Sequence, residues 1–159
     1  MADQVRIERV TVANFDGLIA MLGGLAATAD EPALDATKTA NLRRDLLGDD
    51  PRFEAHLAML GDEVIGGVTL DVRYSTFRAE RLLFMGELYV VEEHQRNGVG
   101  QALFQFAQRR TQELGCGLLQ WNAYGWNAQG RGFYDKNGAF EWGADLVWYG
   151  IRPQEGIAQ

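Results

Sequence analysis

The spacing of apolar residues changes along the chain, and each spacing predicts a type of element. The β-branched residues from Val5 to Val10 predict a short opening strand. After Asn14, a residue type that caps helix starts, apolar residues recur at helical spacing. A second helix is predicted from Thr37 to Leu47, ended by Gly48. The chain therefore opens with a strand and two helices.

Three apolar runs rich in β-forming residues follow the second helix. The first two, Phe53 to Leu60 and Glu63 to Tyr74, are joined by Gly61-Asp62, a residue pair typical of tight turns between antiparallel strands. The third run extends from Leu82 to Val91. We therefore expect a hairpin and a further strand in the middle of the chain.

The last part of the chain alternates helices and strands. Apolar residues on one helical face extend from Val99 to Leu114, and a buried strand is predicted from Leu118 to Tyr124. Asn127 to Lys136 is predicted to form a short helix, and Asp145 to Ile151 a final strand. This order of elements predicts an α+β fold, a mixed α/β sandwich, and a single domain over residues 1–159.

Composition and charge narrow the class of partner. The 159 residues carry 15 Lys and Arg against 22 Asp and Glu, a net charge of −7, which disfavours contact with nucleic-acid backbones and attracts cations. Solubility alone also explains an acidic chain. We therefore expect no nucleic-acid partner, and the charge is compatible with a cationic amine as substrate.

Cysteine usage, hydropathy and histidine placement bear on location and metals. The single cysteine, Cys116, cannot form an internal disulfide, no secretion-signal pattern is present, and no apolar run approaches the ~20 residues that cross a bilayer. His56 and His94 have no Cys/His cluster around them, so no metal site is expected. The sequence predicts a cytoplasmic protein with no membrane partner.

A glycine-containing loop joins the strand at residues 84–91 to the next predicted helix. Gln95, Gly98 and Gly100 lie in this loop, and the helix starts near Val99. A helix start offers unsatisfied backbone N–H groups and a partial positive charge, and glycines let a diphosphate approach the main chain. The loop lacks the Gly-Lys-Ser/Thr of a P-loop and the three glycines of a dinucleotide site. Both an anion site and a purely structural turn agree with these residues.

The residues around this loop resemble a known family. Gln95-x-x-Gly98-x-Gly100 resembles the Q/R-x-x-G-x-G/A signature of the GCN5-related N-acetyltransferase (GNAT) superfamily. Later residues resemble that family's second half in order and spacing: Trp126-Asn127, then Phe133-Tyr134-x-x-x-Gly138-Ala139. The Trp-Asn pair and the strand at Tyr89-Val90 look most like the diamine and polyamine acetyltransferase branch.

This resemblance implies a fold, a co-substrate and an assembly. The fold is the acyl-CoA N-acyltransferase fold, a central, mostly antiparallel sheet flanked by helices, with a V-shaped split between the strands around residues 84–91 and 118–124. Acetyl-CoA is the implied co-substrate, and a homodimer is the implied assembly. In the family the strand at the split pairs with the pantetheine arm and the loop wraps the pyrophosphate. The cofactor-binding residues so implied are Leu88, Tyr89, Val90, Gln95, Arg96, Asn97, Gly98, Val99, Gly100, Gln101, Asn127 and Tyr134.

Two residues are candidates for the chemistry. Tyr134 matches the tyrosine that the family uses to protonate the departing thiolate, although a buried aromatic residue is more often part of a core. Glu87 lies in the strand that would line the cleft, and it is the candidate base for an amine that is charged at neutral pH. The polyamine branch carries an acidic pair where this chain has Gly86-Glu87. The alternatives for Glu87 are therefore a solvated or salt-bridged residue, or one on the other face of the sheet.

The sequence predicts an N-acetyltransferase that moves acetyl directly from the thioester to a small primary amine or polyamine. Asp30, Glu31 and Asp35 support a cationic acceptor, because they lie between the first two helices, a region that commonly lines the acceptor side in this family. An aminoglycoside, a protein or peptide amine, and a non-catalytic acyl-CoA-binding sensor are the alternatives.

The last predicted helix contains two glycines, Gly130 and Gly132, each of which costs about 1 kcal/mol relative to alanine. We therefore expect a loosely formed helix, and a higher melting temperature for Gly130→Ala.

Overall fold

The computed structural model describes residues 4–141. The chain divides into two compact units, residues 1–122 and 123–159. The first unit contains β1 (Val5–Arg9), α1 (Phe15–Ala29), α2 (Ala36–Leu47), β2 (Glu54–Leu60), β3 (Glu63–Ser75), β4 (Glu80–Val90), the 3-10 turn η2 (Glu92–His94), α3 (Val99–Glu113) and β5 (Leu118–Gln120). The described part of the second contains α4 (Ala128–Lys136).

The strands of the first unit form one sheet in the order β1-β2-β3-β4-β5. The pairs from β1 to β4 are antiparallel, and β4 pairs with β5 in parallel. The predicted hairpin and the mostly antiparallel α+β fold are therefore confirmed. The final strand predicted at residues 145–151 lies outside the described residues, and the single-domain assignment stays a prediction.

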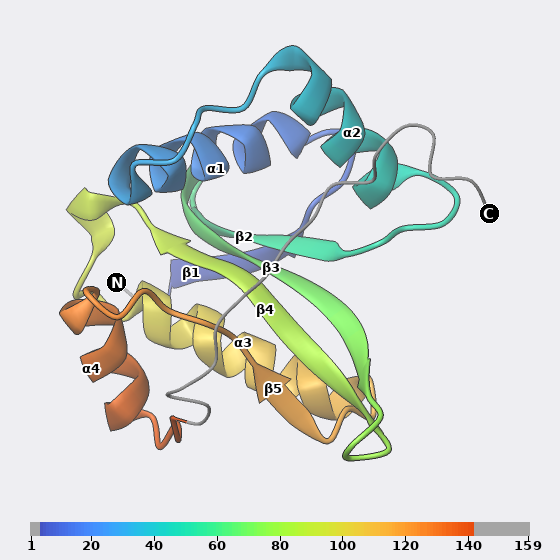
Figure 1. The fold of residues 1–159 in the computed structure, drawn as a ribbon. Coiled ribbons are helices and arrows are strands. Elements are labelled where there is room, and N and C mark those ends of the chain that lie inside the picture. Colours follow the sequence, from blue (N-terminus) through green and yellow to red (C-terminus); the bar gives the residue numbers. More distant parts are fainter. Residues whose placement is uncertain (1–3, 142–159) are drawn as a thin grey trace. The chain divides into compact units, whose positions relative to one another are not determined.

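Helices cover both faces of this sheet, with α1 and α2 on one face and α3 on the other (Figure 1). On the first face Phe15, Leu18 and Met21 of α1 join a buried cluster with Leu57 of β2. On the second face α3 buries Leu103, together with Phe104 and Ala107. Apolar residues repeat every three to four positions in these helices because that period keeps them on one side.

Different side-chain contacts fix the starts of the two helices that cover the first face. Asn14 occupies the cap position of α1, but its side chain accepts from the Thr11 N–H (2.7 Å) and donates to the Arg9 carbonyl (3.2 Å), so it closes the turn instead of capping the helix. In α2 the cap is Asp35, whose carboxylate accepts from the Lys38 N–H at 2.7 Å. Asp35 therefore has a structural role at the start of α2.

Strand β5 is shorter than predicted. It ends at Gln120, whereas the apolar pattern extended the strand to Tyr124. Its pairing with β4 consists of Leu82↔Leu118, Leu83↔Leu119 and Phe84↔Gln120. A strand needs a partner for its backbone groups, and the ladder stops where the two strands separate.

Candidate active site

Strand β4 carries a bulge at the centre of the sheet. Val68 of β3 pairs with Leu88, and Leu70 pairs with Met85, so the single residue Thr69 faces two residues of β4, Gly86 and Glu87. An extra residue in one strand bends that strand and interrupts its hydrogen-bond ladder. The bulge lies just after Phe84, the last residue of β4 that pairs with β5.

From Met85 onward, one edge of β4 is open. Among the described residues, β5 pairs with β4 only as far as Phe84, so the strand from Met85 to Val90 has β3 on one side and no strand on the other. The Val91 N–H donates to the Ile65 carbonyl of β3 at 3.0 Å. Because backbone groups alternate in direction along a strand, those of Leu88 and Val90 point to the open side. The predicted V-shaped split is therefore present within the first unit.

The loop after β4 leads to the start of α3 beside this open edge. The Gln95 side chain donates to the Val90 carbonyl at 3.0 Å and so ties the loop to the strand. Gly98 has φ 84° at the helix start, a left-handed conformation that favours glycine. The first helical bond of α3 runs from the Ala102 N–H to the Gly98 carbonyl (3.0 Å). No side chain of the described part of the chain caps this end, which leaves a helix start able to bind an anion.

Ten of the predicted cofactor-binding residues lie in this strand, loop and helix start, and they are Leu88, Tyr89, Val90, Gln95, Arg96, Asn97, Gly98, Val99, Gly100 and Gln101. Two side chains face inward. Tyr89 packs against the α1 side of the core, and its backbone groups point to β3, away from the open edge. Val99 is 1% exposed, so it offers mainly its backbone to a ligand.

Glu87 contacts Thr69, a residue that was not predicted to belong to the site. Its backbone N–H donates to the Thr69 hydroxyl at 3.0 Å, and the same hydroxyl donates to the Glu87 carboxylate. The Glu87 side chain therefore lies on the same face of the sheet as the Thr69 hydroxyl, and its role as the base stays a prediction. The signal in the sequence was a single threonine within the run Ile65 to Leu70, whose other residues are apolar or glycine. In the structure Thr69 is 6% exposed.

In the second unit, Asn127 caps α4. Its side-chain oxygen accepts from the Gly130 N–H at 2.9 Å, which satisfies one of the free donors at the helix start. A Cβ at Gly130 would lie 2.6 Å from the Asn127 side-chain nitrogen. The helix forms despite its two glycines, but the expected stabilisation by Gly130→Ala is not supported, because the added methyl would crowd the cap.

Tyr134 lies in α4 and is half-buried. Burial raises the pKa of its phenol above the ordinary value of 10.0, which favours the protonated form. Its ring meets Phe133 edge to face, with centroids 5.4 Å apart. In the same unit Trp126 stacks on Tyr124 (5.2 Å), and Arg131 pairs with Glu141 at 2.9 Å.

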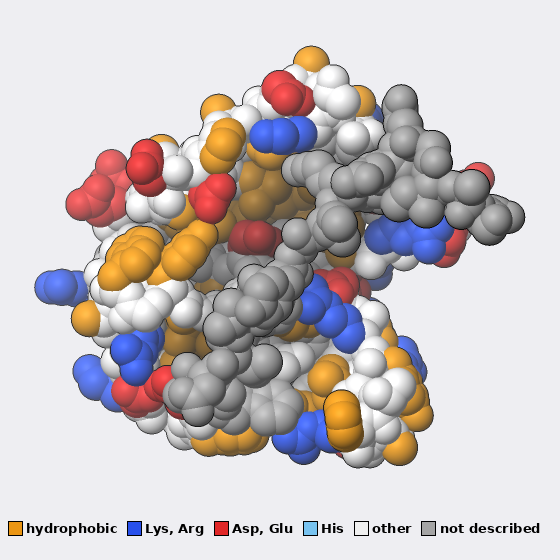
Figure 2. Space-filling view, in the orientation of Figure 1, with side chains coloured by type: hydrophobic (Ala, Val, Ile, Leu, Met, Phe, Trp, Pro, Cys, Tyr) orange, Lys and Arg blue, Asp and Glu red, His pale blue; other side chains and the backbone are white. Residues whose placement is uncertain are grey.

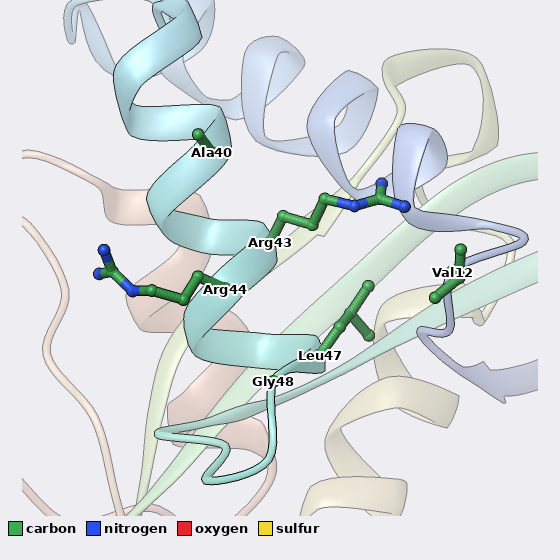
Figure 3. Close-up of a pocket in the computed structure, with 6 residues that line it drawn as sticks. All are labelled: Val12, Ala40, Arg43, Arg44, Leu47 and Gly48. Carbon is green, nitrogen blue, oxygen red and sulfur yellow. The ribbon is translucent and has the colours of Figure 1, made fainter.

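A separate hollow of about 380 Å³ lies beside α2 (Figure 3). Arg43 lies over the Phe15 ring, 5.1 Å from its centroid, and Arg44 is paired with Asp45. The lining residues are Val12, Ala40, Arg43, Arg44, Leu47 and Gly48. None of them was predicted to bind cofactor or substrate.

Acidic and basic side chains are interspersed on the face drawn in Figure 2. Residues 4–141 hold no group of three His, Cys, Asp or Glu side chains arranged to bind a metal. Within the same range no helix has the length and hydropathy needed to span a bilayer.

Comparison with known proteins places these features in a family. L-ornithine N5-acetyltransferase NATA1 of Arabidopsis thaliana is 30% identical over 97 residues, 60% of this chain and 42% of that protein. Spermidine/spermine N(1)-acetyltransferase-like protein 1 of Homo sapiens is 22% identical over 94% of this chain and 22% of its own length. The chain thus spans less than half of either relative.

Solved structures share the fold. An aminoglycoside acetyltransferase, meta-AAC0020, from an uncultured soil metagenomic sample superposes with a TM-score of 0.78 at 19% identity, over 96% of this chain and 98% of that one. Residues 24–139 match the Acetyltransferase (GNAT) family, a range that includes the open edge of β4, the loop to α3, and α4. The protein therefore belongs to the GNAT acetyltransferase family.

Proposed function

We propose that this protein is an acetyl-CoA-dependent N-acetyltransferase that transfers acetyl directly to an amine. The observation that carries the proposal is the open edge of β4 beside the uncapped start of α3. The open edge of β4 offers backbone hydrogen bonds to the amide-rich arm of acetyl-CoA. The start of α3 offers an anion site to its diphosphate.

The cofactor arm would pair with the backbone of Leu88, the Val90 N–H would face the acetyl carbonyl, and the diphosphate would lie at the N–H groups around Gly98 to Gln101. The space around Gly100 suits this role. A Cβ there would meet its nearest neighbour, a Val90 methyl, at 3.7 Å, which is ordinary contact. Packing within the protein therefore does not require glycine at position 100. Close approach of a phosphate to this backbone would require it. Tyr89, Gln95, Arg96, Asn97 and Asn127 complete the proposed set.

Acetyl-CoA supplies an activated thioester, and the residues of this chain would handle the protons. Glu87 would take a proton from the ammonium form of the acceptor, since only the free amine attacks a carbonyl carbon. The outward N–H of Val90 would stabilise negative charge on the acetyl oxygen. The free amine would form the new carbon–nitrogen bond, and as the carbon–sulfur bond breaks the Tyr134 phenol would donate its proton to the thiolate. The second proton of the attacking nitrogen would then return to the phenolate through solvent, which leaves a neutral amide and a neutral phenol. The raised pKa of Tyr134 keeps its proton in place beforehand.

We propose a small primary amine or polyamine as the acceptor. The net charge of −7 and the similarity to ornithine and spermidine/spermine acetyltransferases support it. The structural similarity to an aminoglycoside acetyltransferase supports an aminoglycoside as the second candidate. Thiol release measured with spermidine, diamines, ornithine, lysine, aminoglycosides and short peptides separates these classes.

The central test combines acetyl-CoA binding by calorimetry with thiol release by wild type, Tyr134→Phe and Tyr74→Phe. Tyr74 is 62% exposed on β3 and serves as the matched control. We expect Tyr134→Phe to retain acetyl-CoA affinity and lose turnover, while the control keeps both. Binding without turnover in wild type would favour the sensor, and absence of binding would refute the proposed function.

The homodimer and the cytoplasmic location expected from the sequence stay predictions. Sedimentation of the purified chain would test the first, and fractionation of cells that express it would test the second.

A further inference from the structure

We propose that Thr69 is a positioning residue, which holds the Glu87 carboxylate in the orientation that receives the proton of the acceptor amine. This inference rests on the proposed acetyltransferase function. Thr69 belongs to β3 and Glu87 to β4, and they meet at the bulge. Thr69 itself touches neither substrate nor cofactor in this proposal, and it acts through Glu87.

The hydrogen bonds around the Thr69 hydroxyl fix its direction. A hydroxyl has one proton to donate and two lone pairs to accept with. The Glu87 N–H occupies a lone pair at 3.0 Å, and the hydroxyl proton is directed to the Glu87 carboxylate. The main chain and the side chain of Glu87 are therefore both held by the same oxygen atom.

The support for this hydroxyl is rigid. Thr69 is 6% exposed, and its neighbours in β3, Val68 and Leu70, are 0% and 1% exposed. Its β-branched side chain has few rotamers available in a strand. A glutamate on its own samples many rotamers. Fixing its carboxylate before the amine binds removes the entropy cost of ordering that side chain during the reaction.

The glycine at position 86 belongs to the same arrangement. A Cβ at Gly86 would lie 2.9 Å from the Thr69 hydroxyl oxygen, closer than side-chain atoms normally approach. The hydroxyl thus fills space that a side chain at this position would need. A side chain at position 86, such as the acid of the polyamine branch, would therefore crowd the Thr69 hydroxyl, and in this proposal the chain uses that hydroxyl to orient its remaining acid.

The test compares Thr69→Val, Thr69→Ser and Glu87→Gln with wild type, using the best acceptor from the amine panel. Valine keeps the shape of threonine and removes the hydroxyl, whereas serine keeps the hydroxyl. We expect Thr69→Val to lower kcat about 10- to 100-fold, the effect of losing a hydrogen bond to a charged group, with an unchanged KM for acetyl-CoA. Thr69→Ser should stay within about 3-fold of wild type.

A double variant shows whether the effect passes through Glu87. In the Glu87→Gln background, Thr69→Val should lower kcat by less than about 3-fold, because the carboxylate to be oriented is gone. Thr111→Val is the control for losing a buried threonine hydroxyl: Thr111 is 7% exposed, and its hydroxyl donates to the Ala107 carbonyl within α3 at 2.8 Å. It should leave kcat unchanged.

Three results would overturn the inference: full activity in Thr69→Val, an equal loss in Thr69→Ser, or an equal fold-loss in the presence and absence of the Glu87 carboxylate. An inactive wild type that binds acetyl-CoA would instead refute the proposed function, and the inference with it. Amide NMR gives a further way to distinguish failure of the Thr69 inference from failure of the proposed function. The Glu87 N–H should move upfield in Thr69→Val and keep its position in Thr69→Ser, and this readout needs no turnover.

Discussion

Glu54 on β2 and Arg110 on α3 form a two-pronged ion pair that joins the sheet to the helix beneath it. The Arg110 Nε and Nη2 atoms lie 2.7 and 3.0 Å from the two carboxylate oxygens of Glu54. His56 lies nearby, with Nε2 3.7 Å from Oε1, too far for a hydrogen bond. The Glu54 side chain is 11% exposed, so this carboxylate depends on protein groups for its solvation.

Replacing Arg110 should destabilise the fold strongly. We expect Arg110→Met to lower the free energy of unfolding by about 3 kcal/mol, because the Glu54 carboxylate is left buried without its main partner. The measurement is urea denaturation at pH 7. Arg44→Met is the matched control, since the Arg44–Asp45 pair is exposed and its removal should change stability little. Equal losses in both variants would mean that burial of the Glu54 pair has no special effect.

The same pair predicts how stability depends on acid. Burial by itself would raise the pKa of Glu54, but His56 and Arg110 lower it, and the net pKa is about 2 against an ordinary 4.5. The stabilisation from the ionised carboxylate is therefore complete above pH 4.5 and is lost as the pH falls toward 2. Over this window wild type should lose roughly 2 to 3 kcal/mol more than Glu54→Gln. Parallel curves for the two proteins would contradict the assignment.

Two glycines of the cofactor loop should respond differently to alanine. Gly98→Ala should lower the free energy of unfolding by about 1–2 kcal/mol, because φ 84° is strained for any residue with a Cβ. Gly100→Ala should leave stability unchanged or slightly higher, since its Cβ would have room. It should nevertheless weaken acetyl-CoA binding at least about 10-fold if a phosphate approaches this backbone. Calorimetry measures the acetyl-CoA affinity of each variant, and thermal melting measures its stability. An unchanged affinity in Gly100→Ala would mean that the diphosphate does not lie at this backbone.

The two glycines of α4, Gly130 and Gly132, should also differ in how alanine changes stability. A Cβ added at Gly132 would have no described atom within 4 Å, so Gly132→Ala should raise helix stability by up to about 1 kcal/mol. Gly130→Ala should not, because its methyl would displace the Asn127 cap. Thermal melting of the two variants measures the difference. A higher melting temperature for Gly130→Ala than for Gly132→Ala would show that the Asn127 cap contributes little.

The order and type of the elements were predictable from sequence, since they depend on local spacing. The helix at Val99–Glu113 and the hairpin turn at Gly61-Asp62 follow from apolar period and turn residues within a few positions of each other. The loop from Gln95 to Gly100 was found in the same way, because its motif is contiguous. A local error occurred where a side chain had a choice of partner, since Asn14 bonds to the preceding turn instead of capping the first helix.

The relationships between strands were decided by the tertiary structure alone. Thr69 and Glu87 are 18 positions apart, and Glu54 and Arg110 are 56 apart, so no local pattern brings either pair together. The bulge that places Gly86 and Glu87 opposite Thr69 depends on how β3 and β4 pair, and a shift of one residue in a strand reverses the face of every side chain after it. The sequence by itself therefore determined the family, the loop and the candidate acid. Only the packed sheet decided which face Glu87 occupies and which hydroxyl holds it, because that contact exists only once two distant strands are in register.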